Sequence, residues 1–392
     1  MRSKDTSKIQ SFTIIERASN FGVSSFLDIQ QKSVSTDTSD SHIFACTFNM
    51  TGFDIIGDVH GHADELELLL DRLGYVEVNG VRQHPEGRQA VFLGDLIDRG
   101  PAIRRVLERV KGMIDHGSAM AVMGNHELNA LHYQTWDEAT GKWLRSHTEG
   151  HLKQFSATLE QLTDDLDDWL DWMRTLPVWL KVTDTSGQTC RFVHAAWHET
   201  TMAKLYAQPT ESGEARFRGP FEAPRLTEAG LFDFGRRKNP VTKETPYGYK
   251  VKEKILTGPE IKLPDDHSYL DKEGTRRTSI RIKWWKEPDE NTTLADMLMA
   301  SARTREALKT MGGNTKFLEI PRKKPFVPYP VEGLTFFGHY WLDKTEIAPL
   351  TPQLACLDFS VARGGALVAY RYHTGDKVLF ADRFVVVDSQ PL

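Results

Sequence analysis

Three short apolar runs are each followed by polar residues of the types that bind metal ions. The first run leads into GDVHG at residues 57–61, the second into GDLIDRG at 94–100, and the third into GNHE at 124–127. Carboxylate and amide oxygens together with imidazole nitrogens suit borderline divalent ions. If the three runs are neighbouring parallel strands, their carboxyl ends meet at one edge of a sheet. We therefore expect a metal site at that edge.

Two histidines follow further apolar runs. His194 ends the run at 190–194, and His339 follows the run at 334–338. Residues two apart in an extended segment point to the same side, so the side chains of 58 and 60 can reach one ion. A carboxylate has two oxygens, so that of residue 95 can bridge two ions. The six predicted metal ligands are Asp58, His60, Asp95, Asn125, His194 and His339.

This mixed ligand set favours a pair of divalent ions such as Mn²⁺, Zn²⁺, Fe²⁺ or Ni²⁺ over an all-oxygen Mg²⁺ or Ca²⁺ site. Two ions about 3.5–4 Å apart acidify a bridging water and hold phosphate oxygens for in-line attack. The expected reaction is therefore phosphoester hydrolysis, and the expected partner is a phosphorylated substrate.

Three more residues in these motifs are predicted to be catalytic. His126, next to a predicted ligand, is placed to give the leaving oxygen its proton. A nearby carboxylate favours the charged imidazolium, so Asp98 can orient His126 and keep it cationic. Arg99 has the planar fork of N–H donors that a phosphate accepts.

The spacing of apolar residues predicts the elements that hold these motifs. Strands are expected at 53–56, 91–93 and 119–123, and helices after the first two motifs, because apolar residues recur there every three or four positions. Further expected elements are a helix at 151–176 with an acidic, solvated face, and strands at 178–182, 190–194, 334–338, 354–359, 366–372 and 383–387. Repeated strand–helix units favour an α/β core.

The motifs GDVHG, GDLIDRG and GNHE, with His194 and His339 after later apolar runs, resemble those of the calcineurin-like metallophosphoesterases. The resemblance is to the phosphoprotein phosphatase branch, which includes bacterial protein phosphatases and symmetrical diadenosine tetraphosphatases. It covers residues from about 54 to 127, 178 to 198 and 334 to 388. It implies an α/β sandwich of two β-sheets flanked by helices, with the metals at the carboxyl ends of the strands.

The resemblance also divides the predicted ligands between two metals. It implies Asp58, His60 and Asp95 at one ion, and Asp95, Asn125, His194 and His339 at the other. It assigns the acid pair to His126 and Asp98, and phosphate binding to Arg99. Two features depart from the family: the sequence at 194–197 is HAAW where many members have His-Gly-Gly, and no second phosphate-binding arginine is evident. The candidates for that arginine are Arg216, Arg218, Arg236 and Arg237.

The composition is typical of an ordinary globular protein. The chain has 392 residues, 40% of them hydrophobic, and a formal net charge of −5, so it can bury one large core or two modest ones. It has no apolar run of about 18 residues and no signal-peptide segment, so we expect no membrane span and a cytoplasmic location. Cys46, Cys190 and Cys356 are too scattered for a disulfide framework and are expected to be buried small hydrophobes.

A metallophosphoesterase domain is expected at 50–392, behind an extension rich in Ser, Thr and Asp. Residues 1–49 show little periodicity and are predicted to be mostly disordered, and Met50 is a candidate start of the chain. Residues from about 199 to 332 break the α/β pattern and are predicted to be an inserted subdomain or long loops. Within them, residues 235–325 hold 21 Lys and Arg against 13 Asp and Glu.

Trp284 and Trp285 lie in this basic segment. Aromatic residues flanked by Lys and Arg can bind single-stranded nucleic acid. Packing inside a subdomain is the favoured interpretation, because acidic residues are interspersed and the whole chain is acidic. Nucleic acid is therefore an open but disfavoured partner, and the sequence does not indicate the oligomeric state.

Three functions are consistent with the motifs. The favoured one is a two-metal phosphomonoesterase acting on phosphoproteins or small aryl phosphates. The alternative is a nucleotidase acting on dinucleoside polyphosphates or phosphorylated nucleic-acid ends, since the opening motifs also resemble the phosphatase domain of bacterial polynucleotide kinase-phosphatases. The third is a non-catalytic binding module with the same fold, and the complete ligand set argues against it.

Overall fold

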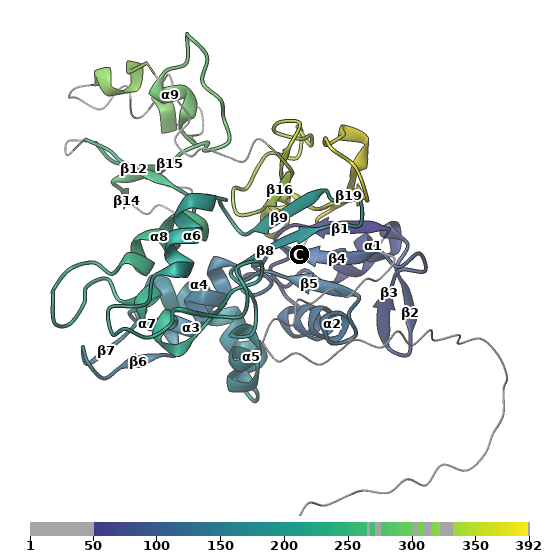
Figure 1. Ribbon diagram of the computed structural model, residues 1–392, viewed down its shortest axis with the longest axis horizontal. Coiled ribbons are helices and arrows are strands. Elements are labelled where there is room, and N and C mark those ends of the chain that lie inside the picture. Colours follow the sequence, from purple (N-terminus) through teal and green to yellow (C-terminus); the bar gives the residue numbers. More distant parts are fainter. Residues whose placement is uncertain are drawn as a thin grey trace, which may run out of the picture. The chain divides into compact units, whose positions relative to one another are not determined.

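The computed structural model describes residues 51–264, 267–270, 276–300, 304–306, 308, 315–321 and 332–390 (Figure 1). The predicted disordered extension at 1–49, the candidate start Met50, Cys46 and parts of the predicted insertion lie outside the described residues. No described helix combines the length and apolar character that a bilayer span requires.

Among the described residues, six strands form the first sheet, and the three opening motifs follow three of them. The order is β18-β19-β1-β4-β5, and β20 also pairs with β19. β1 (Gly52–Ile56), β4 (Gln89–Phe92) and β5 (Ala119–Ala121) run parallel, so their carboxyl ends lie at one edge. The other strands are β18 (Asp358–Phe359), β19 (Ala366–His373) and β20 (Phe384–Asp388).

The second sheet has the strand order β17-β16-β9-β8. Its strands are β8 (Trp179–Thr183), β9 (Thr189–Val193), β16 (Leu334–Phe337) and β17 (Leu354–Cys356). β16 runs parallel to both β9 and β17. The residues that follow β9 and β16, which include His194 and His339, therefore leave this sheet at the same edge.

Successive residues of β1 and β4 face opposite layers. Ile56 and Phe92 belong to the core that includes helices α1 (Ala63–Leu73) and α2 (Ile103–Asp115). Ile55 and Val91 belong to a second core, which is shared with the strands of the second sheet. Apolar residues on both faces are expected for a sheet that is covered on both sides. The predicted α/β sandwich of two sheets flanked by helices is confirmed (Figure 1).

The segment predicted to be helical at 151–176 is largely helical, but it forms two helices, α4 (Glu149–Leu162) and α5 (Leu166–Met173), and not one. The break falls at Asp165, whose backbone leaves the helical region with φ −140° and ψ 25°. The Asp165 carboxylate binds the guanidinium of Arg104 at 2.6 Å and accepts the indole N–H of Trp169 at 3.1 Å. The contact with Arg104 is long-range, so helical periodicity alone did not reveal it.

The prediction of one strand at 354–359 is wrong, because β17 and β18 belong to different sheets. The N–H of Leu357 donates to the Phe337 carbonyl at 2.8 Å, and the next residue, Asp358, pairs with Leu367 of β19. The chain therefore crosses from the second sheet to the first within one apolar run.

The region after β9 holds short elements. They are α6 (Glu199–Ala207), β10 (Phe217–Arg218), β11 (Arg225–Leu226), α7 (Glu228–Gly235), α8 (Tyr247–Ile255), β12 (Glu260–Lys262), β13 (Tyr269–Leu270), β14 (Arg276–Arg277), β15 (Ser279–Arg281), α9 (Leu294–Met297) and η1 (Thr315–Glu319). Part of this region has a small core of its own that includes Ile280 and Leu298. The insertion boundaries at 199 and 332 stay a prediction.

The remaining elements lie before β8 or near the end of the chain. They are β2 (Val76–Val78), β3 (Val81–Gln83), α3 (Asn125–Tyr133), β6 (Trp136–Asp137), β7 (Lys142–Trp143), η2 (Val361–Arg363) and η3 (Ala381–Arg383). The third opening motif forms the first turn of α3, which places its polar residues at a helix start.

Trp284 and Trp285 are buried, with 0% and 6% of their surface exposed. Their rings lie 4.9 and 5.4 Å from that of Phe337, which ends β16. The pair is buried, as favoured, but it belongs to the main core and not to the small core of the inserted region. Cys190 and Cys356 are buried, as predicted.

His132, on α3, is expected to make the fold sensitive to acid. Burial lowers its pKa to about 3, and its Nε2–H donates to the Leu231 carbonyl at 3.1 Å. The unfolded histidine binds a proton near pH 6.5, so the free energy of unfolding falls as the pH drops from 6.5 toward 3. Between pH 6.5 and 4.5 we expect the free energy of unfolding of the wild type to fall by about 2–3 kcal/mol more than that of His132→Gln. Urea unfolding at both pH values measures this, and equal losses would contradict it.

Candidate active site

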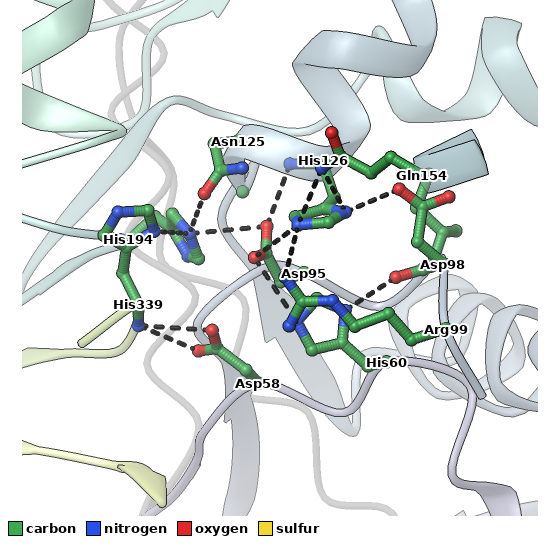
Figure 2. A network of polar contacts seen from close by, with 12 residues as sticks. Asp58, His60, Asp95, Asp98, Arg99, Asn125, His126, Gln154, His194 and His339 are labelled. Carbon is green, nitrogen blue, oxygen red and sulfur yellow. Dashed lines mark hydrogen bonds and ion pairs between the residues drawn. The ribbon is translucent and has the colours of Figure 1, made fainter. Parts of the chain in front are cut away.

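The structure brings the six predicted ligands together from five strand ends, as Figure 2 shows. They follow strands β1, β4, β5, β9 and β16, whose last residues are buried. The side chains are buried as well, with exposed fractions between 0 and 9%. Parallel pairing within each sheet brings these ends to common edges.

Backbone carbonyls fix the orientation of three imidazoles. The Nδ1 atoms of His60 and His194 lie 2.8 Å from the carbonyl oxygens of Ile97 and Leu93, and Nε2 of His339 lies 2.9 Å from that of Thr257. A ring that donates one N–H to a carbonyl presents the lone pair of its other nitrogen, which is the form that binds metals.

The nitrogens that remain face one another and the predicted bridging carboxylate. Nε2 of His194 lies 3.1 Å from Nδ1 of His339 and 3.0 Å from Oδ1 of Asn125. Asp95 places Oδ1 at 3.3 Å from Nε2 of His194 and Oδ2 at 3.6 Å from Nε2 of His60. Two imidazole nitrogens at this distance repel through their lone pairs unless a proton or a metal cation lies between them. This donor set therefore fits divalent cations.

Asp58 contributes buried negative charge. Its two oxygens each lie 3.2 Å from the backbone nitrogen of His339. Burial, together with the charges of Asp358 and Asp95, raises the pKa of Asp58 well above its ordinary value. A bound cation would offset this repulsion, which again fits a metal site.

The ligand atoms form two groups among the described residues. His60, Asp95 and His126 make one group, and Asp95, His194 and His339 make the other, with all atoms of a group within 4.8 Å of one another. Asp95 belongs to both, which agrees with a bridging position. His126 stands in this group where the family resemblance implies Asp58, so the roles of these two residues stay predictions.

The acid pair is in contact: Nδ1 of His126 lies 2.5 Å from Oδ2 of Asp98. Two residues of α4, which the sequence analysis did not single out, hold this pair. The Thr158 hydroxyl donates to Oδ1 of Asp98 and accepts its backbone N–H at 3.0 Å. Nε2 of Gln154 lies 3.3 Å from Nε2 of His126. Positions 154 and 158 are four residues apart and share one face of a helix. This spacing was the sign in the sequence that the two side chains could act at the same place.

Arg99 contacts two residues of the first ligand group. It donates to Nε2 of His60 at 2.9 Å and to Nε2 of His126 at 3.2 Å. Its guanidinium lies 4.7 Å from the ring centre of Trp341, and the guanidinium of Arg363 lies 4.1 Å from the same ring. Trp341 therefore supports Arg99 at the site, whereas its neighbour Tyr340 is buried and packs against Trp285.

Backbone strain is concentrated in this site. Five of its non-glycine residues have positive φ angles: His60 (46°), Asp95 (52°), Asp98 (67°), Arg99 (71°) and His339 (74°). Such conformations cost roughly 1–3 kcal/mol each and persist only where the surroundings impose them. The positions of these five side chains therefore lower the stability of the folded protein.

Glu127 is a buried positioning residue in the first turn of α3. Its carboxylate accepts the backbone N–H groups of Asp95, Leu96 and Gly124 at 2.9, 2.7 and 2.8 Å. It thereby joins the loop after β4 to the start of α3. Gly124 permits this approach, because a Cβ there would lie 2.2 Å from the Asp95 nitrogen.

Glu127→Gln is expected to lower the free energy of unfolding by about 2–4 kcal/mol, because an amide leaves at least one buried N–H without an acceptor. We also expect a fall in catalytic rate of roughly 10–100-fold through displacement of Asp95. Urea unfolding and kcat measure the two effects. Glu160→Gln, at an exposed position of α4, is the matched control. A Glu127→Gln variant as stable and active as the wild type would contradict this role.

Two of the four arginines proposed for a second phosphate contact are engaged elsewhere. Arg216 is buried against Asp233 at 2.7 Å, and Arg236 binds Asp137 at 2.6 Å. Arg218 lines a separate cavity beside Trp136. Arg145, which the sequence analysis missed, donates to Oε1 of Gln154 at 2.7 Å and thus lies one side chain away from His126.

Comparison with known proteins agrees with this geometry. Residues 52–218 match the family model described as calcineurin-like phosphoesterase. The asymmetrical bis(5'-nucleosyl)-tetraphosphatase PrpE of Halalkalibacterium halodurans is 51% identical over 74 residues, which are 19% of this chain and 30% of that protein. The protein of the same name from Bacillus thuringiensis is 41% identical over 119 residues, 27% of this chain and 48% of that protein. The chain thus spans less than half the length of these relatives.

Two solved structures align with most of the chain at low sequence identity. A structure described as a putative diadenosine tetraphosphatase is 17% identical with a TM-score of 0.39, and covers 87% of this chain and 96% of its own. A cold-active protein tyrosine phosphatase is 14% identical with a TM-score of 0.42, and covers 86% of this chain and 78% of its own.

Proposed function

We propose that this chain, which carries a calcineurin-like metallophosphoesterase domain, hydrolyses phosphoric esters with the help of two divalent metal ions. The observation that carries the proposal is the position of Asp95 between two sets of imidazole nitrogens, with its oxygens 3.3 Å from His194 and 3.6 Å from His60. One carboxylate between two nitrogen sets suits a pair of ions better than one ion.

The residues would divide as the family resemblance implies. Asp58, His60 and Asp95 would hold one ion, and Asp95, Asn125, His194 and His339 the other. Such a pair of ions acidifies a water and binds phosphate oxygens. Whether the ions are Mn²⁺, Zn²⁺, Fe²⁺ or Ni²⁺ stays a prediction.

The chain's own groups supply the remaining chemistry. Arg99 binds the phosphate through its fork of N–H donors. His126 gives a proton from Nε2 to the leaving oxygen, while Asp98 holds Nδ1 and keeps the ring in the required orientation. Thr158 fixes the Asp98 carboxylate from behind.

Two substrate classes remain in competition. Phosphoproteins and small aryl phosphates are one, and dinucleoside polyphosphates or phosphorylated nucleic-acid ends are the other. The names of the curated relatives support the nucleotide class. The aligned residues are only 19–27% of this chain, so these names do not by themselves assign a substrate.

A substrate panel tests the proposal. The protein is assayed with Mn²⁺ on p-nitrophenyl phosphate, a phosphopeptide, diadenosine tetraphosphate and a phosphorylated oligonucleotide, at low and high salt. We expect hydrolysis of at least one of them, abolished by a chelator. A polyanionic substrate held by several Lys and Arg should lose affinity steeply with salt, whereas a phosphopeptide should lose much less. Failure to hydrolyse any of the four would favour the non-catalytic binding module.

A further inference from the structure

A buried carboxylate outside the predicted ligand set lies where the chain crosses between the two sheets. Asp358 is 2% exposed and begins β18, directly after the chain leaves β17 of the second sheet. Its Oδ2 accepts the backbone N–H of Trp341 at 2.9 Å, and its Oδ1 accepts that of Ser360 at 2.9 Å. One side chain therefore fixes two segments, the loop after β16 and the turn after β18.

Both residues that Asp358 holds have strained backbones. The φ angle is 49° at Trp341 and 62° at Ser360. A bulky residue seldom adopts this left-handed conformation, and the strain persists only where the surroundings impose it, commonly at functional sites. The Asp358 carboxylate helps to impose it, since each N–H that it accepts belongs to one of these two residues. The conformation of Trp341 therefore points to a functional constraint.

The strained loop places the indole of Trp341 against the predicted phosphate-binding arginine. The ring centre lies 4.7 Å from the guanidinium carbon of Arg99 and 4.1 Å from that of Arg363. Arg363 belongs to the turn that Asp358 holds, since its backbone N–H donates to the Ser360 carbonyl at 2.8 Å. Both segments fixed by the one carboxylate thus meet at the same ring.

The stack on Trp341 matters because two other contacts of Arg99 are with groups that have their own roles. Arg99 donates to Nε2 of His60 at 2.9 Å and to Nε2 of His126 at 3.2 Å. The first residue is a predicted metal ligand, and the second is the predicted proton donor. The stack uses neither nitrogen, so it can hold the guanidinium while both perform these roles. A guanidinium that is already held loses less conformational entropy when it binds a phosphate.

We propose that Trp341 and Asp358 are positioning residues for phosphate binding: Asp358 fixes the backbone of Trp341, and the indole holds Arg99 in the orientation that binds a phosphate. The proposal rests on the proposed function, in which Arg99 binds the phosphate. Both residues lie outside 52–218, the part of the chain that the family model matches, so that match does not assign them a role.

A double-mutant cycle through Arg99 is the first test. kcat/KM for p-nitrophenyl phosphate is measured with Mn²⁺ in Trp341→Leu, in Arg99→Gln and in the double variant. We expect Trp341→Leu to lose about tenfold, mainly through a higher KM, because one cation–π contact is removed. In the Arg99→Gln background the same substitution should cost less than about twofold, because the indole has no Arg99 guanidinium to hold. An equal loss in both backgrounds would overturn the proposal.

Two further variants separate the ring from the carboxylate. Trp341→Phe keeps a flat aromatic ring and should retain more than about a third of the wild-type kcat/KM, and a value as low as that of Trp341→Leu would contradict the stack. Asp358→Asn leaves one backbone N–H without an acceptor. Its loss in kcat/KM should also disappear in the Arg99→Gln background, and an Asp358→Asn variant as active as the wild type would exclude the role of the carboxylate.

The matched controls lie away from the candidate site. Trp136→Leu makes the same change at an exposed tryptophan whose ring contacts Trp143 and lines a separate cavity. Asp184→Asn makes the same change at a buried carboxylate that accepts the backbone N–H groups of Ser186 and Gln188. Both controls should match the wild type, and a loss of the same size in either would overturn the proposal.

Metal and phosphate binding separate this proposal from the proposed function. Mn²⁺ content should be the same in Trp341→Leu and the wild type, and a loss of metal would overturn the proposal by placing the effect at the neighbouring predicted ligand His339. Calorimetry measures the binding of inorganic phosphate to the Mn²⁺-loaded wild type and to Trp341→Leu. Binding that is about tenfold weaker in the variant supports the positioning role even if no ester is hydrolysed, and equal binding overturns it even if hydrolysis is robust.

Discussion

Asp95→Asn is expected to lower kcat for a phosphomonoester by at least about 1,000-fold, which corresponds to roughly 4 kcal/mol of transition-state stabilisation. The two oxygens of Asp95 face His194 and His60 at 3.3 and 3.6 Å. An amide keeps one oxygen and loses the charge, so it is a poor bridge between two cations. Metal content, measured alongside kcat, should fall below that of the wild type.

The control for this variant is Asp184→Asn. Asp184 is also buried, but its carboxylate accepts hydrogen bonds from Ser186 and Tyr372 away from the candidate site. Asp184→Asn should keep its metal and its rate. An Asp95→Asn variant with wild-type metal content and activity would exclude the bridging position.

His126→Asn is expected to slow hydrolysis most for esters whose leaving group must be protonated. Loss of a general acid costs about 100- to 10,000-fold for esters with poor leaving groups, whereas p-nitrophenyl phosphate, whose leaving group needs little protonation, should lose far less. The measurement is kcat for phenyl and for p-nitrophenyl phosphate, together with metal content.

Metal content matters here because Nε2 of His126 lies 3.7 Å from Oδ2 of Asp95 and within one of the two ligand groups. Normal metal content with a leaving-group-dependent loss supports the acid role. Loss of metal, with equal effects on both esters, would instead make His126 a ligand. His198→Asn, at the N-cap of α6, is the histidine control and should match the wild type.

The central strands were predictable because local sequence sets them. β1, β4 and β5 are short apolar runs that end at glycine-containing motifs, and parallel strands covered on both faces have few other arrangements. The boundary at Asp165 and the crossing at Leu357 were not predictable, because each depends on a partner distant in sequence, Arg104 or Phe337.

The candidate site likewise contains residues that the local sequence predicts and residues that it does not. Residues inside the motifs meet because the strand ends meet. Thr158 lies 60 positions from its partner Asp98, and Gln154 lies 28 positions from His126. Arg145 lies 9 positions from its partner Gln154. A local sequence pattern does not predict which loop a helix will contact. Glu127 was visible in GNHE, but its three backbone partners were not, because two of them belong to the preceding motif.

The most direct test of a two-metal phosphoesterase is a metal titration. Protein stripped with a chelator is titrated with Mn²⁺ by calorimetry, and hydrolysis of p-nitrophenyl phosphate is followed over the same additions. The two ligand groups that share Asp95 predict two ions per chain, with activity rising as the second ion binds. A single ion per chain, or full activity in excess chelator, would contradict the account.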